Sequence, residues 1–160
     1  LPLLPGAGDE AYDEAFESVI LPALELFHPD VLVTQLGTDA VLGDLLANLR
    51  MSLRGFERAV ERFRATGTPW LALGGGGYDV PNVVRAWTLT WGAMLGETLP
   101  DEIPSTWMTA AAARGVTVSR LRGSADVPPT PDRVMEALRK SAQLIRETAF
   151  PILEDAAKRG

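Results

Sequence analysis

The sequence has 160 residues, of which 46% are hydrophobic and 22% charged, and its formal net charge at pH 7 is −6. These values are ordinary for one folded domain or part of one. The acidic charge argues against a nucleic-acid partner, since such proteins normally carry a basic stripe. No apolar run approaches the ~20 residues that a membrane helix needs. The absence of cysteine excludes disulfides and thiolate metal sites, and it favours a cytoplasmic location.

The first predicted element is a helix that follows a start rich in proline and glycine. Asp9 is expected to cap it, and apolar residues then recur at helical spacing up to Phe27. Pro22 should kink this helix, because proline lacks the amide donor and clashes with the preceding turn. Pro29 should end it. We interpret His28, the only histidine, as a surface or capping residue, because a zinc site without cysteine usually needs two or three imidazoles.

Two apolar runs predict β-strands over residues 31–36 and 70–73. The first run is apolar on both faces, which is typical of a strand covered by helices on both sides of the sheet. The helix between them should begin after Ser52, its N-cap, and end before Gly67. Strand, helix and strand in this order predict a parallel α/β sheet. Because two strands do not make a stable parallel sheet, we expect the chain to be part of a larger doubly wound domain.

The rest of the chain is predicted to be mostly helical. A helix that ends at Gly96 is expected to bury its large apolar side chains. These are Val83, Val84, Trp87, Trp91, Met94 and Leu95. Because the composition changes after this helix, we divide the chain into a body, residues 1–104, and a C-terminal extension, residues 105–160. The extension should carry a short helix and end in a long helix that breaks near Pro151.

Candidate functional residues follow both predicted strands. Gly37, Thr38 and Asp39 come after the first strand, whereas residues 74–77 are four glycines that lead to Tyr78 after the second. Because sites in parallel sheets gather at the carboxyl ends of the strands, Asp39 and Tyr78 should lie at the same edge. The glycine run is not a phosphate loop of the Walker A type, which ends in Gly-Lys-Ser/Thr, and it also lacks the third glycine of a dinucleotide fingerprint.

Each candidate also has a purely structural interpretation. The glycine run either lets a narrow ligand approach the backbone or lets a strand pack closely against a helix. Tyr78 either donates a hydrogen bond to a developing oxyanion or is a half-buried packing residue. Asp39 either ligates a metal such as zinc or closes a turn. Asp44 is the competing carboxylate, which we interpret as an exposed loop or cap group. Spacing alone leaves these alternatives open.

Two segments resemble signature stretches of the zinc-dependent histone deacetylases. They are residues 35–44, with the sequence QLGTDAVLGD, and residues 73–78, with the sequence LGGGGY. Residues 82–87, NVVRAW, are similar to the Asn-Val-Ala-Arg-x-Trp of that family. The resemblance covers about residues 1–104, and the bacterial acetoin-utilisation branch looks nearest. It implies an α/β fold, the three-layer α/β/α parallel-sheet arrangement of arginases and deacetylases, of which this chain would be the C-terminal portion.

The resemblance also implies roles for five residues. Asp39 would be one of three zinc ligands, and Tyr78 would donate a hydrogen bond to the acetyl carbonyl opposite the metal. Gly75, Gly76 and Leu46 would line the narrow channel for an acyl-lysine chain. The implied reaction is metal-assisted hydrolysis of the amide in acetyl-lysine or a small acetylated amine. Leu45 and residues 49–51 depart from the family pattern. Both departures affect the expected rim of the pocket.

The family's tandem histidines and its Asp-x-His ligand pair lie N-terminal to the matched region. His28 sits at the wrong place to replace them. We therefore interpret the chain as the C-terminal half of a deacetylase, inactive alone and associated with its missing N-terminal half or with a second copy of itself. The alternative is a non-catalytic remnant of the fold that serves as an assembly or interaction module.

Overall fold

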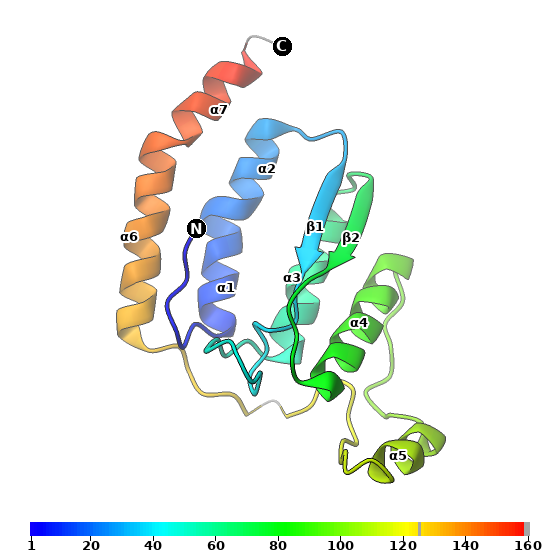
Figure 1. Cartoon of the computed structure of the whole chain (residues 1–160). Coiled ribbons are helices and arrows are strands. Elements are labelled where there is room, and N and C mark those ends of the chain that lie inside the picture. Colours follow the sequence, from blue (N-terminus) through cyan, green and yellow to red (C-terminus); the bar gives the residue numbers. More distant parts are fainter. Residues whose placement is uncertain (125, 159–160) are drawn as a thin grey trace.

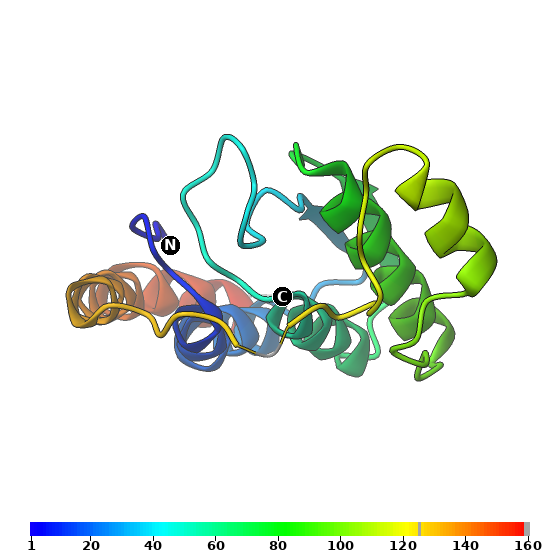
Figure 2. The same ribbon diagram turned by 90° about the horizontal axis from the view of Figure 1, so that it is seen from below.

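The computed structural model describes residues 1–124 and 126–158. Its elements are α1 (Asp9–Ala15), the π-helical turn η1 (Phe16–Ile20), α2 (Leu21–Phe27), β1 (Leu32–Leu36), α3 (Leu53–Ala65), β2 (Trp70–Gly74), α4 (Val80–Leu95), α5 (Ser105–Ala112), α6 (Asp132–Thr148) and α7 (Phe150–Ala157). Figures 1 and 2 show α1, α2 and α3 on one side of the two strands, with α6 and α7 running beside α1 and α2. In the part of the chain described, no helix is both long and apolar enough to cross a membrane.

Strands β1 and β2 pair in parallel, as the strand–helix–strand order predicts. Leu32 lies opposite Trp70, and Leu36 lies opposite Gly74. The register therefore brings the carboxyl ends of both strands to the same edge of the sheet, where Figure 1 shows both arrowheads.

The described residues cover only one face of this sheet. Side chains of β1 alternate between buried and exposed, so that Leu36 joins the core whereas Val33 is 57% exposed. In β2, Leu71 and Leu73 are 53% and 46% exposed. The expectation that both faces of the first strand are covered is thus wrong for this chain, because only one face of the strand packs into the helical core. The open face is apolar and suits a further layer.

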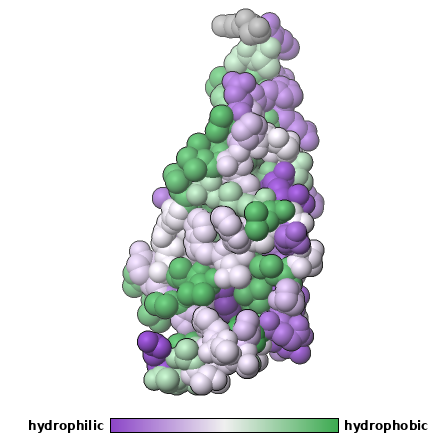
Figure 3. Space-filling view, turned by 90° about the vertical axis from the view of Figure 1, so that its right-hand side faces the viewer, coloured by the Kyte–Doolittle hydropathy of each residue, from purple (hydrophilic) through white to green (hydrophobic). Residues whose placement is uncertain are grey.

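Helix α4 buries only part of the face that was expected. Its buried apolar residues are Ala86, Leu89 and Ala93, and it lies against α3. Trp91 is 64% and Leu95 59% exposed. The expected burial is therefore wrong for these two residues, and also for Val84 and Met94, whereas Trp87 packs against the core. Figure 3 shows apolar areas, interrupted by polar ones, on the face of the molecule where α4 and α5 lie.

The first helix continues through a π-helical turn. Its N-cap is Gly8, not the expected Asp9. Pro22 was expected to distort this helix, and the π-helical turn η1 ends two residues before it. Pro22 has no amide to donate to the oxygen of Ser18 four residues earlier, and Arg146 Nη1 donates to that oxygen instead, at 2.9 Å. His28 ends the helix in the left-handed conformation (φ 48°), which confirms that it is a capping residue.

The C-terminal helices pack on the first helix. In α6, Val134 and Leu138 form an apolar cluster with Ala11 of α1. The chain breaks between α6 and α7 at Ala149, which confirms the predicted break near Pro151. The division of the chain after residue 104 stays a prediction.

Substituting Leu138→Ala should destabilise the protein by about 2–5 kcal/mol, because the side chain is only 1% exposed and its loss leaves a cavity. Leu144→Ala is the matched control in the same helix. Leu144 is 60% exposed, so its loss should change the free energy of unfolding by no more than about 0.5 kcal/mol. Urea denaturation of the two variants measures the difference, and equal effects would contradict the packing of α6 on α1.

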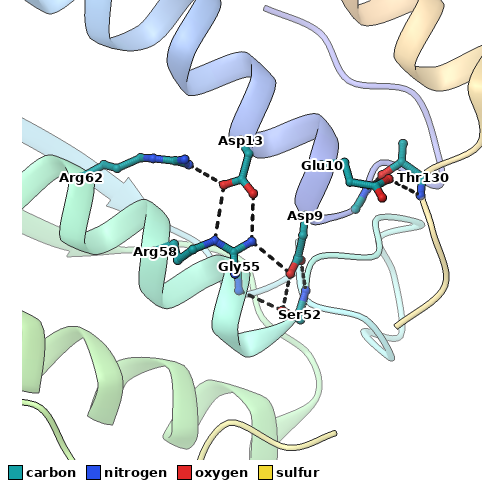
Figure 4. Close-up of polar contacts among 9 residues, drawn as sticks. Asp9, Glu10, Asp13, Ser52, Gly55, Arg58, Arg62 and Thr130 are labelled. Atoms are coloured by element: carbon teal, nitrogen blue, oxygen red, sulfur yellow. Dashed lines mark hydrogen bonds and ion pairs between the residues drawn. The ribbon is translucent and has the colours of Figure 1, made fainter. Parts of the chain in front are cut away.

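Carboxylates of α1 hold the start of α3 in place (Figure 4). Asp9 accepts hydrogen bonds from the backbone N–H and the hydroxyl of Ser52, both at 2.6 Å. The Ser52 hydroxyl also caps α3, as predicted. Asp13 accepts from Arg58 and Arg62 of α3. Charge-assisted contacts of this kind are stronger than neutral ones, so they fix the helix that connects β1 to β2.

The stability of this contact should depend on pH. Burial raises the pKa of Asp13, but hydrogen bonds and charge from Arg58 and Arg62 outweigh it and lower that pKa below its ordinary value. Ionised Asp13 therefore stabilises the fold above the unfolded pKa of about 3.9, and the stabilisation disappears as pH falls through the lower, folded pKa. Asp13→Asn should thus be destabilising at pH 7, and the difference from wild type should shrink below about pH 4. Denaturation at several pH values, with Asp155→Asn as an exposed control, checks this. A difference that does not change with pH would exclude the ionised pair as the cause.

Candidate active site

The loops that follow β1 and β2 lie against each other. The backbone N–H of Thr38 donates to the oxygen of Gly76 at 2.6 Å. This contact brings the two candidate stretches, residues 37–39 and 74–78, together at the carboxyl edge of the sheet. The prediction that Asp39 and Tyr78 share one edge is confirmed by the register of the strands.

The carboxylate of Asp39 sits directly beside the glycine loop. A Cβ placed on Gly76 would lie 2.1 Å from Asp39 Oδ2, and a Cβ on Gly37 would lie 2.8 Å from Asp39 Oδ1. Real Cβ atoms essentially never come so close, so both positions need glycine for the carboxylate to occupy its place. A Cβ on Gly75 would lie 2.9 Å from Gly37 Cα, where the two backbones touch. The glycine run thus serves close packing of loop on loop; its role in a channel stays a prediction.

A pocket of about 370 Å³ opens beside Asp39, between β1 and the helices. Its other lining residues are mostly apolar: Tyr12, Phe16, Ile20, Gln35, Leu36, Gly37, Ala40, Leu49, Met51, Phe56, Ala59, Val60, Phe63 and Gly76. Burial, and then the negative charge of Asp39, raises the pKa of Tyr12 to about 12. The phenol of Tyr12 therefore stays neutral at physiological pH and can donate a hydrogen bond within the pocket.

Tyr78 lies between β2 and α4 and is 48% exposed. The preceding glycine is held against the other loop, because a Cβ on Gly77 would lie 2.2 Å from Thr38 Oγ1. Leu46 is 68% exposed on the loop after β1, which suits a residue at a rim. The structure therefore brings the backbone of the predicted residues together at one edge, whereas their chemical roles stay predictions.

Sequence reasoning missed two residues that join the loops. Asp44 does act as a loop cap, but it also accepts a hydrogen bond from the backbone N–H of Tyr78 at 2.8 Å. Asn82 is only 5% exposed and donates to the oxygen of Leu42 at 3.2 Å. Their positions in the stretches that resemble the family were the available signal, since Asp44 closes residues 35–44 and Asn82 opens residues 82–87.

The described residues do not by themselves make a zinc site. Catalytic zinc sites take three protein ligands. Within residues 1–124 and 126–158, no three His, Cys, Asp or Glu side chains gather to hold a metal. His28 ends α2 before β1 begins, whereas Asp39 follows the other end of that strand. As a zinc ligand, Asp39 would therefore need partners from outside the described residues.

Comparison with known proteins identifies the family. The family model "Histone deacetylase domain" matches residues 1–94. The chain belongs to the histone deacetylase family. "Putative histone deacetylase 2" of Caenorhabditis elegans is 42% identical over 106 residues, which are 66% of this chain and 21% of that protein. "Histone deacetylase 1" of Homo sapiens is 37% identical over 103 residues, 64% of this chain and 21% of that protein. The chain therefore spans only about a fifth of these relatives' length.

A solved structure extends the similarity into the C-terminal extension. The crystal structure of an HDAC homologue complexed with SAHA superposes with a TM-score of 0.74 at 27% identity, over 88% of this chain and 41% of that chain. The chain thus has the arginase/deacetylase fold, and the two-stranded sheet with one covered face is part of that α/β domain. The relatives named here are eukaryotic, so they do not confirm a bacterial acetoin-utilisation type.

Proposed function

We propose that this chain is the C-terminal half of a zinc-dependent amide hydrolase that removes acetyl groups from acetyl-lysine or small acetylated amines. The observation that carries the proposal is the meeting of the Asp39 loop and the Tyr78 loop at one edge of the sheet. A carboxylate and a phenol are among the groups that this chemistry needs. Membership of the deacetylase family supports the reaction class.

Each residue has one task in this proposal. Asp39 supplies one of three ligands to zinc, which in such sites polarises a carbonyl and acidifies a bound water. The phenol of Tyr78 donates a hydrogen bond to the acetyl oxygen and stabilises the oxyanion that develops there. Gly75, Gly76 and Leu46 line the channel that admits the acyl-lysine chain.

The remaining ligands come, in this proposal, from the N-terminal half of the domain. The apolar sheet face that includes Val33, Leu71 and Leu73 is the surface that this half covers. Association with a second copy is the alternative way to bury the face. A cytoplasmic location, the lack of nucleic-acid and membrane partners, and the acetoin-utilisation branch rest on composition and resemblance alone.

Zinc binding and peptide deacetylation test the proposal. The 160-residue chain is measured alone and after co-expression with the part of a deacetylase domain that precedes the matched region. We expect the chain alone to bind zinc weakly and to leave an acetyl-lysine peptide intact, because two of three ligands are missing. The co-expressed pair should bind zinc tightly and hydrolyse the peptide. Activity of the zinc-loaded chain alone would contradict the fragment proposal.

A second candidate is a non-catalytic assembly module that keeps the fold. The observation that favours it is that, within the residues described, no three His, Cys, Asp or Glu side chains gather to hold a metal. The coding sequence upstream of Leu1 separates the two. Paired histidines and an Asp-x-His pair encoded there support the hydrolase, whereas a start codon next to Leu1 supports the module.

A further inference from the structure

The carboxylate of Asp44 joins the two loops of the candidate site. We infer that Asp44 is a positioning residue that holds the Tyr78 loop against the loop carrying Asp39 and Leu46. The inference rests on the proposed function, since it concerns how Tyr78 is placed to meet the acetyl oxygen. It gives this carboxylate a task that goes beyond capping its own loop.

Three backbone donors converge on this one side chain. Asp44 Oδ2 accepts from the N–H of Tyr78 at 2.8 Å. Asp44 Oδ1 accepts from the N–H of Leu46 at 2.9 Å and from that of Ala47 at 3.1 Å. One oxygen thus shapes its own loop while the other reaches a segment 34 residues further along the chain. Hydrogen bonds to an ionised carboxylate are about twice as strong as neutral ones, so this link can hold an otherwise exposed loop.

The ionised form of Asp44 is the one that suits these contacts. Burial raises the pKa of Asp44, but the three N–H donors, together with the N–H of Asp79 next to Tyr78, outweigh it and lower that pKa below its ordinary value. Both oxygens are therefore acceptors at neutral pH. An asparagine of the same shape offers only one acceptor oxygen, and its NH₂ group would face another N–H. The single oxygen of Asp44→Asn should take the place of Oδ1, where the two donors Leu46 and Ala47 meet it, so the contact with Tyr78 is the one that is lost.

A second contact fixes the same two segments independently. Asn82, in the first turn of α4, donates to the oxygen of Leu42 at 3.2 Å. Gly43 turns the chain between this contact and Asp44. Its φ of +96° is a backbone conformation that residues with a side chain rarely adopt. Because Asn82 holds the neighbouring backbone, loss of the Asp44 contact should release Tyr78 without unfolding the loop.

Amide hydrogen exchange in the 160-residue chain tests directly whether Asp44 holds the backbone N–H of Tyr78. In the wild type, the Tyr78 amide should exchange slowly although the residue is 48% exposed. In Asp44→Asn its exchange should accelerate by about tenfold or more, since a hydrogen bond to a charged group is lost. The NMR signals of Tyr78, Leu46 and Ala47 should move, whereas Asp155→Asn should move none of them. A Tyr78 amide that already exchanges freely in the wild type, or that is unchanged in Asp44→Asn, overturns the inference. The wild-type measurement decides even if the variant does not fold.

Turnover of the assembled enzyme gives an independent result. Asp44→Asn should lower kcat by about tenfold to a hundredfold with little change in KM or zinc content, because only the placement of Tyr78 changes. Asp44→Glu, which keeps a carboxylate, should recover part of the loss. An unchanged kcat despite a freed Tyr78 amide overturns the positioning role. If the assembled wild type has no deacetylase activity, the proposed function fails, whereas the exchange experiment still decides whether Asp44 holds Tyr78.

Discussion

Tyr78→Phe should reduce deacetylation by the assembled enzyme by about a hundredfold to a thousandfold, the usual effect of removing one oxyanion donor. The substitution removes only the hydroxyl, and the ring can keep its half-exposed place between β2 and α4. Because the backbone N–H of Tyr78 makes the contact with Asp44, the position of the loop should not change. The loss should appear in kcat, since the hydrogen bond strengthens as charge develops on the acetyl oxygen.

Zinc content separates this effect from misfolding. The variant should retain zinc, because Asp39 and the other proposed ligands are intact. Tyr12→Phe is the matched control, since it removes the only other tyrosine hydroxyl of the chain from the pocket beside Asp39. That variant should keep far more activity than Tyr78→Phe. Equal losses in the two variants, or full activity of Tyr78→Phe, would remove the oxyanion role from Tyr78.

The positions of the main elements could be predicted from sequence because local signals were strong there. Ser52 and Gly67 bracket α3, and the apolar runs correspond to β1 and β2. Burial was harder to predict. The strand around Val33 is apolar on both faces, and the sequence cannot show that this chain covers only one of them. In α4 the larger side chains suggested the buried face, whereas Ala86 and Ala93 make the contact.

For the candidate site, too, the location of the residues could be predicted, whereas the contacts that hold them could not. Asp39 and Tyr78 could be placed at one edge because parallel strands end together. The contacts that set their positions are long-range and were not predictable from spacing. The hydrogen bond from Tyr78 to Asp44 and the one from Asn82 to Leu42 join segments that only the fold brings together. Glycine was expected to allow a close approach, but only the structure shows that the atom approaching Gly76 belongs to Asp39.

Because the Asp39 carboxylate lies so close to Gly76, the substitution Gly76→Ala should displace it. The added Cβ would lie 2.1 Å from Asp39 Oδ2, so either the carboxylate or the loop must move. A shift of about 1 Å is enough to cost roughly a hundredfold in turnover. We expect the assembled enzyme to lose most of its activity and to bind zinc at least about tenfold more weakly, since a displaced ligand no longer matches the preferred geometry.

Gly74→Ala is the matched control in the same glycine run. It adds the same methyl group, but the nearest atom would be Trp87 Cζ2 at 3.8 Å, an ordinary contact. Zinc affinity, measured by competition with a chromophoric chelator, should therefore stay near the wild-type value in Gly74→Ala and fall in Gly76→Ala. Both variants can lose stability through crowding, so affinity is compared at temperatures where each remains folded. Wild-type affinity in a folded Gly76→Ala protein would contradict the prediction that the added Cβ displaces a zinc ligand.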